Sequence, residues 1–533
     1  MFLWCMLWRL IAAVLVSTTY VPDEYFQSVE VAYHAVHGHG IVTWEWEDGF
    51  RIRSFLSILP FAAYFKLLQV CGIHSQWMYA VGPRFIQAIA VAISDSCLYH
   101  VSMAAWGGRQ DVEKKRGIGY DSGLWTLLLQ CSNWYSMYSA TRTMANTTET
   151  FIYIMVLYMW YSLAESVPTS RYREWLAMCL MCLQSYARPT SVLLFVPIIV
   201  AHVVENRHKA SELFRFAVAC TLSGSLCAIL GILVDSLFYN EAWSISPLNF
   251  LYFNVYKKVS SLFGTQSGYW NFVVGLPTAL GLTFPLLGSS LWLLLKEKTL
   301  LLTHKVLLQA VTALVVFPLG LHCFSYHQEL RFLSPVLPAA HIVLGSGIAL
   351  WTVRAGKDKY QSRRTIAALL LGAIALVHSI GAVYLLVRHQ GGPERAARQV
   401  ALMAASSSKQ QFSVMLLAPC YAFPGYSFMH TPPHVQMRLV EPEKCSPFEE
   451  KSDSSLFEES PLTYYFRLSA KAGADAVLTF DAYSEKDEGQ GKTLEQALLR
   501  DGYLLQETFH HADFRYDYDS AFAPKKVLLY RRH

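Results

Sequence analysis

Long apolar runs without a single charged residue dominate this sequence. Asp, Glu, Lys and Arg are all missing from six segments, which are 122–141, 216–234, 259–295, 306–328, 332–353 and 365–387. About 20 such residues let a helix span the hydrocarbon core of a membrane. Charged residues make up only 16% of the chain, whereas soluble domains carry about 25%. The sequence predicts an all-α polytopic membrane protein and excludes a soluble enzyme, a disordered chain and a nucleic-acid-binding protein.

Short basic segments between the apolar runs predict the orientation. Lys and Arg are enriched in cytosolic loops, and 109–116, 207–209 and 354–364 are the basic segments here. Placing all three in the cytosol requires about 11 transmembrane helices, with a cytosolic N-terminus and a C-terminus on the opposite side. The predicted crossings are 2–19, 79–105, 122–140, 150–166, 174–187, 190–204, 211–238, 271–296, 303–322, 333–352 and 365–387. We expect the segment 54–73 to lie at the non-cytosolic interface without crossing it.

The chain changes character after the last apolar run. Residues 1–387 are predicted to form a transmembrane domain with a large extramembrane loop at 20–78. Residues 388–533 are charged and rich in proline, and they contain strand-like runs such as 476–480. We therefore expect a small mixed α/β domain on the non-cytosolic side.

Two further features suit this orientation. Cys420 and Cys445 both fall in the C-terminal part, where they could form a disulfide in an oxidising compartment. The sequon that begins at Asn146 also falls on the non-cytosolic side, so Asn146 is predicted to be an N-glycosylation site.

Two adjacent carboxylates follow the first apolar run. Asp23 and Glu24 come directly after Pro22. Proline is favoured at the first position of a helix, and acidic side chains in the first turn are stabilised by the helix dipole. The pair is either an N-terminal helix cap or a catalytic pair, and spacing alone does not separate these hypotheses.

The same loop carries Trp44, Glu45 and Trp46. The flat indole rings can stack on the face of a sugar ring, so this loop with its paired Trp and mixed charge suits a carbohydrate. The alternative is an aromatic belt at the membrane interface.

Basic side chains lie at the predicted non-cytosolic ends of other helices. Arg142 is one, and His327 and Arg331 belong to the run His-Gln-Glu-Leu-Arg. The planar guanidinium of Arg matches the oxygens of a phosphate. The alternative for Arg331 is an interfacial anchor paired with Glu329.

Motifs for cofactors and metals are missing. There is no Gly-rich nucleotide-binding fingerprint. His34, His37 and His39 do not share one face of a helix, which disfavours a metal site. We expect no cofactor and no metal.

Several blocks of this sequence resemble the dolichyl-phosphate-mannose-dependent mannosyltransferases of glycosyltransferase family 22. They run along most of the chain in order: PDEYFQSVEVA, GHGIVTWEW and RIRS within 22–54, TRTMAN at 141–146, ARPT at 187–190, 264–285, 327–338, APCY at 418–421 and PGYS at 424–427. One position departs from the family pattern, because Val21 stands where His commonly precedes Pro-Asp-Glu.

The resemblance implies a C-type glycosyltransferase fold in the endoplasmic reticulum membrane, with a lumenal active site under the first loop. The donor's β-linked mannose becomes α-linked in the product, so the reaction inverts the anomeric centre and needs a base. The phosphate leaving group would be stabilised by cations.

The resemblance also assigns roles to residues of this chain. Asp23 and Glu24 become the catalytic carboxylates, with Asp23 as the base and Glu24 orienting the acceptor. The remaining expected contacts are Arg331, His327 and Arg142 to the donor phosphate, and Gln27, Trp44, Glu45 and Trp46 to the acceptor.

Within the family, Val-Pro-Asp-Glu and Thr-Trp-Glu-Trp look most like the branch that adds the third mannose to a dimannosyl glycosylphosphatidylinositol (GPI) precursor. The alternatives are a sister enzyme of N-glycan precursor assembly or the fourth-mannose GPI enzyme. A lipid or solute transporter, with Arg9 and Asp95 as its buried charges, is the competing hypothesis from another class.

Overall fold

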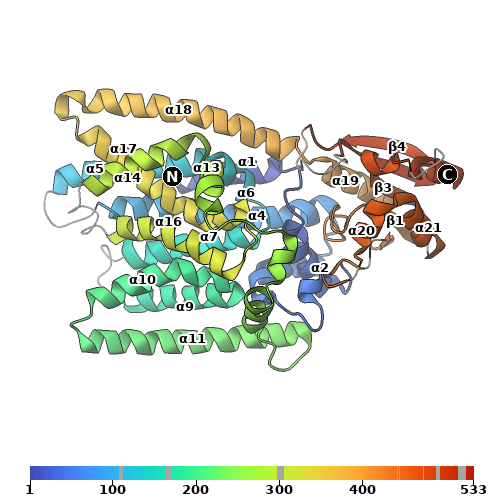
Figure 1. Cartoon of the computed structure of the whole chain (residues 1–533), viewed down its shortest axis with the longest axis horizontal. Coiled ribbons are helices and arrows are strands. Elements are labelled where there is room, and N and C mark those ends of the chain that lie inside the picture. The colour runs from blue at the N-terminus through green and yellow to red at the C-terminus, as the bar shows by residue number, and fades with distance from the viewer. Residues whose placement is uncertain are drawn as a thin grey trace.

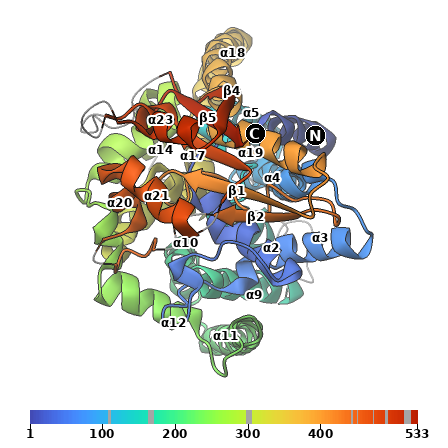
Figure 2. The same ribbon diagram turned by 90° about the vertical axis from the view of Figure 1, so that its right-hand side faces the viewer.

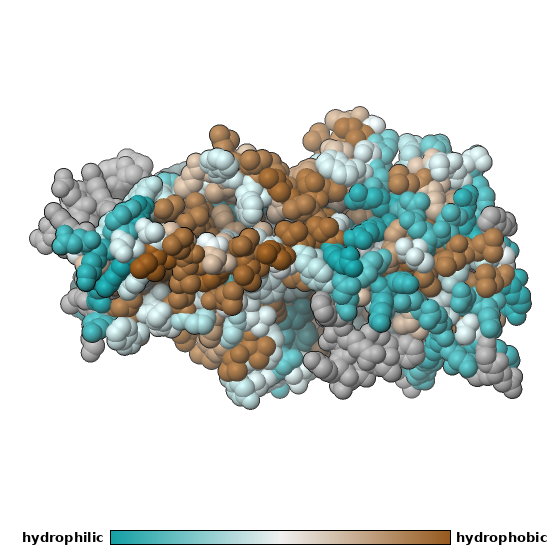
Figure 3. All heavy atoms as spheres, turned by 90° about the horizontal axis from the view of Figure 1, so that it is seen from above, coloured by the Kyte–Doolittle hydropathy of each residue, from teal (hydrophilic) through white to brown (hydrophobic). Residues whose placement is uncertain are grey.

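The computed structural model describes residues 1–106, 112–162, 171–296, 305–440, 442, 444–449, 451–471, 473–487, 492–513 and 524–532. Helices fill one end of the elongated molecule, and the described strands lie together at the other end (Figure 1). Apolar side chains gather on the surface of the helical end, whereas the sheet end is mostly hydrophilic (Figure 3). This division of the surface fits a helical bundle surrounded by lipid.

The helices follow the apolar runs. Those before residue 388 are α1 (Phe2–Leu15), α2 (Glu30–His37), α3 (Leu59–Val70), α4 (Gln76–Ala104), α5 (Val112–Ser132), α6 (Trp134–Ser139), α7 (Ala145–Leu157), α9 (Arg171–Ala187), α10 (Val192–Glu205), α11 (Ala210–Tyr239), α12 (Ser246–Phe250), α13 (Leu276–Leu280), α14 (Phe284–Lys296), α16 (Lys305–Phe324), α17 (Leu337–Val353) and α18 (Lys357–Val387). The chain is thus mostly helical, as predicted.

Six helical segments of the described chain are long and apolar enough to span a membrane. They are Gln76–Ala104, Ala210–Tyr239, Asn271–Lys296, Lys305–Phe324, Leu330–Val353 and Asp358–Val387. Each coincides with a predicted crossing. The other five predicted crossings correspond to shorter or less apolar helices, so the total of 11 stays a prediction. Residues 163–166 and 303–304, and the start of the basic segment 109–116, lie outside the described residues.

One predicted crossing is interrupted. The sequence predicts a span over 122–140, but α5 ends at Ser132 and α6 begins at Trp134. Asn133 separates them, because its side-chain oxygen accepts a hydrogen bond from the backbone N–H of Ser136 at 2.9 Å and caps α6. A hydropathy criterion does not detect this break, since the whole segment is uncharged.

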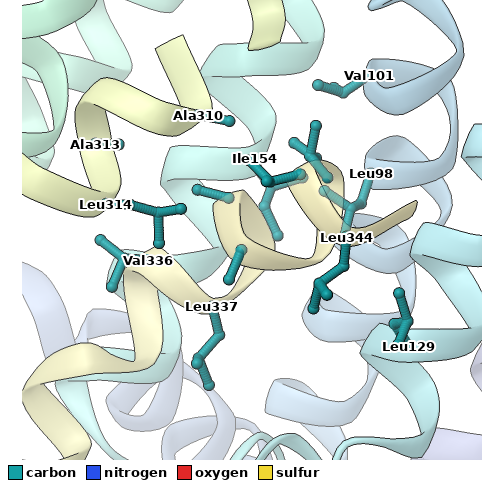
Figure 4. Packing of buried hydrophobic residues seen from close by; sticks show 14 of the residues in the cluster. Leu98, Val101, Leu129, Ile154, Ala310, Ala313, Leu314, Val336, Leu337 and Leu344 are labelled. Carbon is teal, nitrogen blue, oxygen red and sulfur yellow. The ribbon is translucent and has the colours of Figure 1, made fainter. Parts of the chain in front are cut away.

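Helix α17 forms the centre of the bundle. Side chains of α4, α5, α7 and α16 surround it (Figure 4), including Leu98, Leu129, Ile154 and Leu314. By contrast, α11 and α18 lie at opposite edges of the bundle (Figures 1 and 2) and expose apolar side chains along their length. Between α1 and α4, Arg9 Nε lies 2.7 Å from Asp95 Oδ2, and both side chains are fully buried. These two charges therefore pair with each other.

The described strands form a mixed five-stranded sheet. They are β1 (Gln411–Leu417), β2 (Gln436–Val440), β3 (Ala476–Phe480), β4 (Tyr503–His510) and β5 (Lys526–Arg532), in the order β2-β1-β3-β5-β4. β1 is parallel to β2 and β3, and β5 is antiparallel to β3 and β4. The accompanying helices are α19 (Gly392–Ala405), α20 (Asp453–Glu459), α21 (Pro461–Lys471), α22 (Asp481–Ser484) and α23 (Leu494–Arg500).

Both faces of the sheet are covered, because side chains alternate between faces along each strand. Met415 and Leu417 pack in the hydrophobic cluster that α20, α21 and α23 cover. Val414 and Leu416 share another cluster with α19 and with Phe26 and other residues of the first loop. The C-terminal sheet and the first loop therefore form one hydrophobic core.

Candidate active site

A cavity of about 380 Å³ lies among segments that are distant in sequence. The first loop, the start of α7, the residues after α9, the chain after α12 and the segment before α17 each contribute to its wall. Its charged and aromatic lining comprises Asp23, Phe26, Trp44, Glu45, Arg53, Arg188, Phe250, Phe263, His327, Glu329, Arg331, Phe332 and Tyr421. The sequence-predicted residues Asp23, Gln27, Trp44, Glu45, Asn146, His327 and Arg331 all line it.

The first helical turn after Pro22 separates the two adjacent carboxylates. The backbone N–H of Tyr25 donates to the carbonyl of Pro22 at 3.0 Å, so a helix begins here, as expected from the proline. Successive residues of a helix point about 100° apart. Asp23 consequently lines the cavity with its side chain 27% exposed, whereas the Glu24 side chain is 2% exposed and points inward.

Arg331 connects two carboxylates at the cavity wall. Its Nη1 lies 2.5 Å from Asp23 Oδ2, and its Nη2 lies 2.7 Å from Glu329 Oε1. His327 Nε2 lies 2.9 Å from the same Glu329 oxygen. The structure thus brings Asp23, His327 and Arg331 together, with Glu329 as an additional anion between the two basic groups.

The ionisation states of Glu329 and His327 follow from their contacts. Burial alone would raise the pKa of Glu329, but the hydrogen bond from His327 and the charge of Arg331 lower it to about 2. The hydrogen bond to Glu329 raises the pKa of His327 above its ordinary value, against the opposing effect of burial. Cationic His327 is therefore favoured beside Arg331.

Two further arginines line the cavity. Arg53 Nη2 donates to Glu45 Oε1 at 2.7 Å, and Arg188 Nε lies 2.9 Å from Glu149 Oε2. Arg188 lies at a predicted lumenal helix end and Arg53 in the predicted first loop, but neither was among the residues predicted to contact the donor or the acceptor. Arg53 belongs to the RIRS block and Arg188 to the ARPT block. The resemblance to the family therefore covered both positions.

Glu24 and Arg142 pair with each other inside the protein. Arg142 is fully buried, and its Nη1 donates to Glu24 Oε2 at 2.9 Å and to the carbonyl of Thr18 at 2.6 Å. Its Nε donates to the carbonyl of Tyr138 at 3.0 Å, and Glu24 Oε1 accepts from the backbone N–H of Tyr20 at 2.8 Å. Neither charged side chain lines the cavity. Glu24 and Arg142 therefore lie outside the cavity that Asp23, His327 and Arg331 line.

Two other predicted residues are also enclosed. Trp46 is 3% exposed and packs against Phe238 and Tyr239 outside the main cavity. Asn146 is also only 3% exposed, and it lies in the first turn of α7 on the cavity wall.

A buried carboxylate at the end of α11 holds three wall segments in place. Asp235 accepts hydrogen bonds from Ser54 Oγ at 2.9 Å, Tyr186 OH at 3.1 Å and Ser246 Oγ at 2.8 Å. It also accepts one from the backbone N–H of Phe55 at 2.8 Å. These segments lead directly to cavity residues, so Asp235 fixes the wall without contacting the cavity.

Among the residues that the structure describes, no group of three or more His, Cys, Asp or Glu side chains is arranged to hold a metal ion.

In the C-terminal part, Cys420 and Cys445 form a disulfide, as their shared location predicted. Tyr421, the neighbour of Cys420, lines the cavity.

Solved structures share this fold. ArnT from Cupriavidus metallidurans, crystallised with undecaprenyl phosphate, matches with a TM-score of 0.58 and 12% identity, over 99% of this chain and 97% of that one. The Archaeoglobus fulgidus oligosaccharyltransferase matches with a TM-score of 0.51 and 11% identity, over 90% of this chain and 69% of that one. The likeness to these C-type glycosyltransferases bears out the predicted C-type fold of the helical part.

Sequence relatives and a family profile agree with the fold. The GPI alpha-1,2-mannosyltransferase 3 of Danio rerio is 29% identical, covering 98% of this chain and 88% of that protein. Mannosyltransferase APTG1 of Arabidopsis thaliana is also 29% identical, over 97% and 90%. The human GPI alpha-1,2-mannosyltransferase 3 is 27% identical, over 86% and 75%. The profile of the Alg9-like mannosyltransferase family matches residues 1–430. The chain belongs to this family and is a glycosyltransferase.

Proposed function

We propose that this protein transfers mannose from dolichyl-phosphate-mannose to a dimannosyl GPI precursor and forms an α1,2 linkage, adding the third mannose. The observation that carries the proposal is the juxtaposition of Asp23 and Arg331, 2.5 Å apart on the wall of one cavity. A base for the acceptor hydroxyl and a cation for the leaving phosphate are thus adjacent. The relatives named GPI alpha-1,2-mannosyltransferase 3 support the choice of acceptor.

Asp23 acts as the general base in this proposal. Its carboxylate is partly exposed to the cavity, so an acceptor hydroxyl can approach it. Asp23 removes the hydroxyl proton while the oxygen attacks the anomeric carbon of mannose from the face opposite the phosphate. One displacement of this kind converts a β-linked donor into an α-linked product. No cofactor is required.

Arg331 and His327 contact the donor phosphate. Nη1 and Nη2 of the guanidinium contact Asp23 and Glu329, and its remaining N–H groups can bind phosphate oxygens. Arg53 and Arg188 line the same cavity, and they supply additional positive charge as negative charge develops on the leaving phosphate. A lipid phosphate entering this cavity would meet four basic side chains.

Glu24 and Arg142 have a structural role in this proposal. Their buried ion pair holds the first loop against the chain before α7. The acceptor is contacted instead by Gln27, Trp44 and Glu45, which line the cavity near Asp23.

We place the protein in the endoplasmic reticulum membrane, among its lipids, with the active site and the C-terminus in the lumen. The disulfide between Cys420 and Cys445 supports the lumenal side, since disulfides persist in oxidising compartments. Residues 1–387 would form the transmembrane catalytic domain, with its lumenal loop at 20–78, and 388–533 the lumenal C-terminal domain. An accessibility tag at His208 should be reached from the cytosol, and one at Ser408 only from the lumen.

The test is an assay of purified protein with dolichyl-phosphate-mannose. The acceptor panel contains a dimannosyl GPI precursor, a trimannosyl GPI precursor and N-glycan precursors. We expect transfer to the dimannosyl GPI precursor, with an α1,2 linkage in the product by NMR. Preferential transfer to a trimannosyl GPI or N-glycan acceptor would assign the enzyme to a sister reaction instead.

A matched pair of variants tests the base. Asp23→Asn should lower kcat by about 100- to 10,000-fold, with thermal stability close to that of the wild type. Asp48→Asn is the control, because Asp48 lies in the same loop with its side chain 89% exposed and does not line the cavity. Near-normal turnover by Asp23→Asn would remove Asp23 from the chemistry.

A further inference from the structure

A second cavity of about 290 Å³ lies beside the proposed active site. Its wall consists of residues 40–42 and Glu47 of the first loop, together with Tyr421 and residues near Cys445. Tyr421 also lines the first cavity. The two cavities therefore adjoin at this one side chain.

The position of Tyr421 is fixed by its surroundings. Its φ of 64° lies in the left-handed region, which is unusual for a bulky residue. The preceding residue, Cys420, is bonded to Cys445 on the wall of the second cavity. The Tyr421 ring packs against Phe26, with centroids 4.9 Å apart, and Phe26 lines the first cavity. An aromatic ring is thus held at the boundary between the cavities.

One short segment of the first loop lines both cavities. Residues 43–45 line the first, whereas residues 40–42 and Glu47 line the second. The fully buried Glu30 carboxylate accepts hydrogen bonds from the backbone N–H groups of Ile41 at 3.1 Å and Tyr426 at 2.8 Å. This single carboxylate fixes the first loop to the chain that follows Tyr421, so the two cavities keep their relative position.

The second cavity has the chemistry of a carbohydrate subsite. Glu47 and Glu449 bring carboxylates that can accept hydrogen bonds from hydroxyl groups, and Lys444 brings an ammonium group that can donate. Lys444 Nζ lies 3.9 Å from Glu449 Oε2, and these side chains remain 55% and 40% exposed. Charged groups that are weakly paired and partly hydrated are available to a polar ligand.

We propose that the second cavity binds the part of the acceptor glycan that lies beyond the two mannoses. The inference rests on the proposed function, which places the acceptor hydroxyl at Asp23. The glycan would continue past Trp44 and Tyr421 into the second cavity, where Glu47 and Glu449 accept hydrogen bonds from its hydroxyl groups. The enzyme would then recognise the length of its acceptor as well as the terminal mannose.

Two acceptors with the same reacting mannose test this proposal. The short acceptor is an alkyl α-dimannoside, and the long acceptor carries the same dimannoside extended by glucosamine and inositol phosphate. For the double variant Glu47→Gln/Glu449→Gln we expect kcat/KM to fall about 10-fold with the long acceptor, since each lost hydrogen bond to a charged group weakens binding. With the short acceptor kcat/KM should be unchanged. Glu459→Gln, on the exposed surface of α20, is the control.

A second measurement does not depend on weakened binding. Ser446→p-benzoylphenylalanine places a photocrosslinker on the wall of the second cavity. Irradiation should link it to the long acceptor and not to the short one. The proposal is overturned if the double variant affects both acceptors equally, or if no crosslink forms while the long acceptor is being turned over. Absence of transfer to the long acceptor by the wild type would instead refute the proposed function.

Discussion

Substitution of Glu24 by Gln should affect the stability of the protein more than the chemistry of transfer. The Glu24 and Arg142 side chains are 2% and 0% exposed. Removing one charge of such a pair leaves the other uncompensated in a buried environment, which typically costs about 3–5 kcal/mol. The change Glu24→Gln is nearly isosteric, so packing is preserved and the effect reports on the charge.

The local contacts favour the lower end of that range. Arg142 retains the carbonyl of Thr18, the hydroxyl of Thr18 and the carbonyl of Tyr138 as hydrogen-bond acceptors. Its guanidinium also lies 4.5 Å from the centre of the Tyr138 ring. The Gln side chain can still accept from the backbone N–H of Tyr20. We therefore expect a loss of about 3 kcal/mol in the free energy of unfolding.

The assay is thermal unfolding in detergent at one fixed scan rate, combined with kinetics. Unfolding entropy of about 2.1 cal/mol/K per residue, applied to 533 residues, converts 3 kcal/mol to a decrease in Tm of about 3 °C. Glu459→Gln should leave Tm unchanged, because the ion pair of Glu459 with Lys451 is exposed. The folded fraction of Glu24→Gln should retain most of its kcat. An unchanged Tm with a 100-fold loss of kcat would refute this reasoning and return Glu24 to the chemistry.

Three other predictions concern the wall of the site. Asp235→Ala leaves four hydrogen-bond donors without their acceptor, so we expect a loss of about 3 kcal/mol in stability, seen as a lower Tm, together with a reduced kcat/KM. Because the pKa of His327 is raised, its positive charge is fully present below about pH 6.5 and is lost as pH rises through the raised value. The KM for the donor should therefore increase above about pH 6.5 in the wild type and be independent of pH in His327→Gln. A wild-type donor KM that does not change with pH would contradict a role for the charge of His327. Because Asn146 is buried, endoglycosidase treatment should not change the electrophoretic mobility of the wild type, and a mobility shift that Asn146→Gln abolishes would contradict the structure.

The apolar runs predicted the helices well because burial in lipid imposes one requirement on a whole segment. Each of the six long spans coincides with a predicted crossing. The break at Asn133 was missed, since it depends on one side chain capping the next helix. The composition of residues 388–533 indicated a mixed α/β domain. Its packing against Phe26 and the rest of the first loop could not be predicted, because it depends on contacts between opposite ends of the sequence.

For the candidate site, the sequence identified Asp23, His327 and Arg331, which the structure brings together. It did not separate Asp23 from Glu24, because the two are adjacent and only the helix phase decides which one faces the cavity. Arg142 could not be distinguished from Arg188 by residue type either. Both are arginines at helix ends, and their partners Glu24 and Glu149 are distant in sequence.

The hydrophobic core shared by the first loop and the sheet sets an order of events during synthesis. Phe26 packs in the same cluster as Phe428 and Leu529. At about 5–20 residues per second, the ribosome needs roughly 20–80 s to proceed from the first of these phenylalanines to the second. During that interval the first loop can pack against α3 and α4, but the sheet that covers the rest of its apolar side has not been made. A chain truncated before the sheet should consequently be inserted in the membrane, retained by chaperones and degraded, even though every long spanning helix is present.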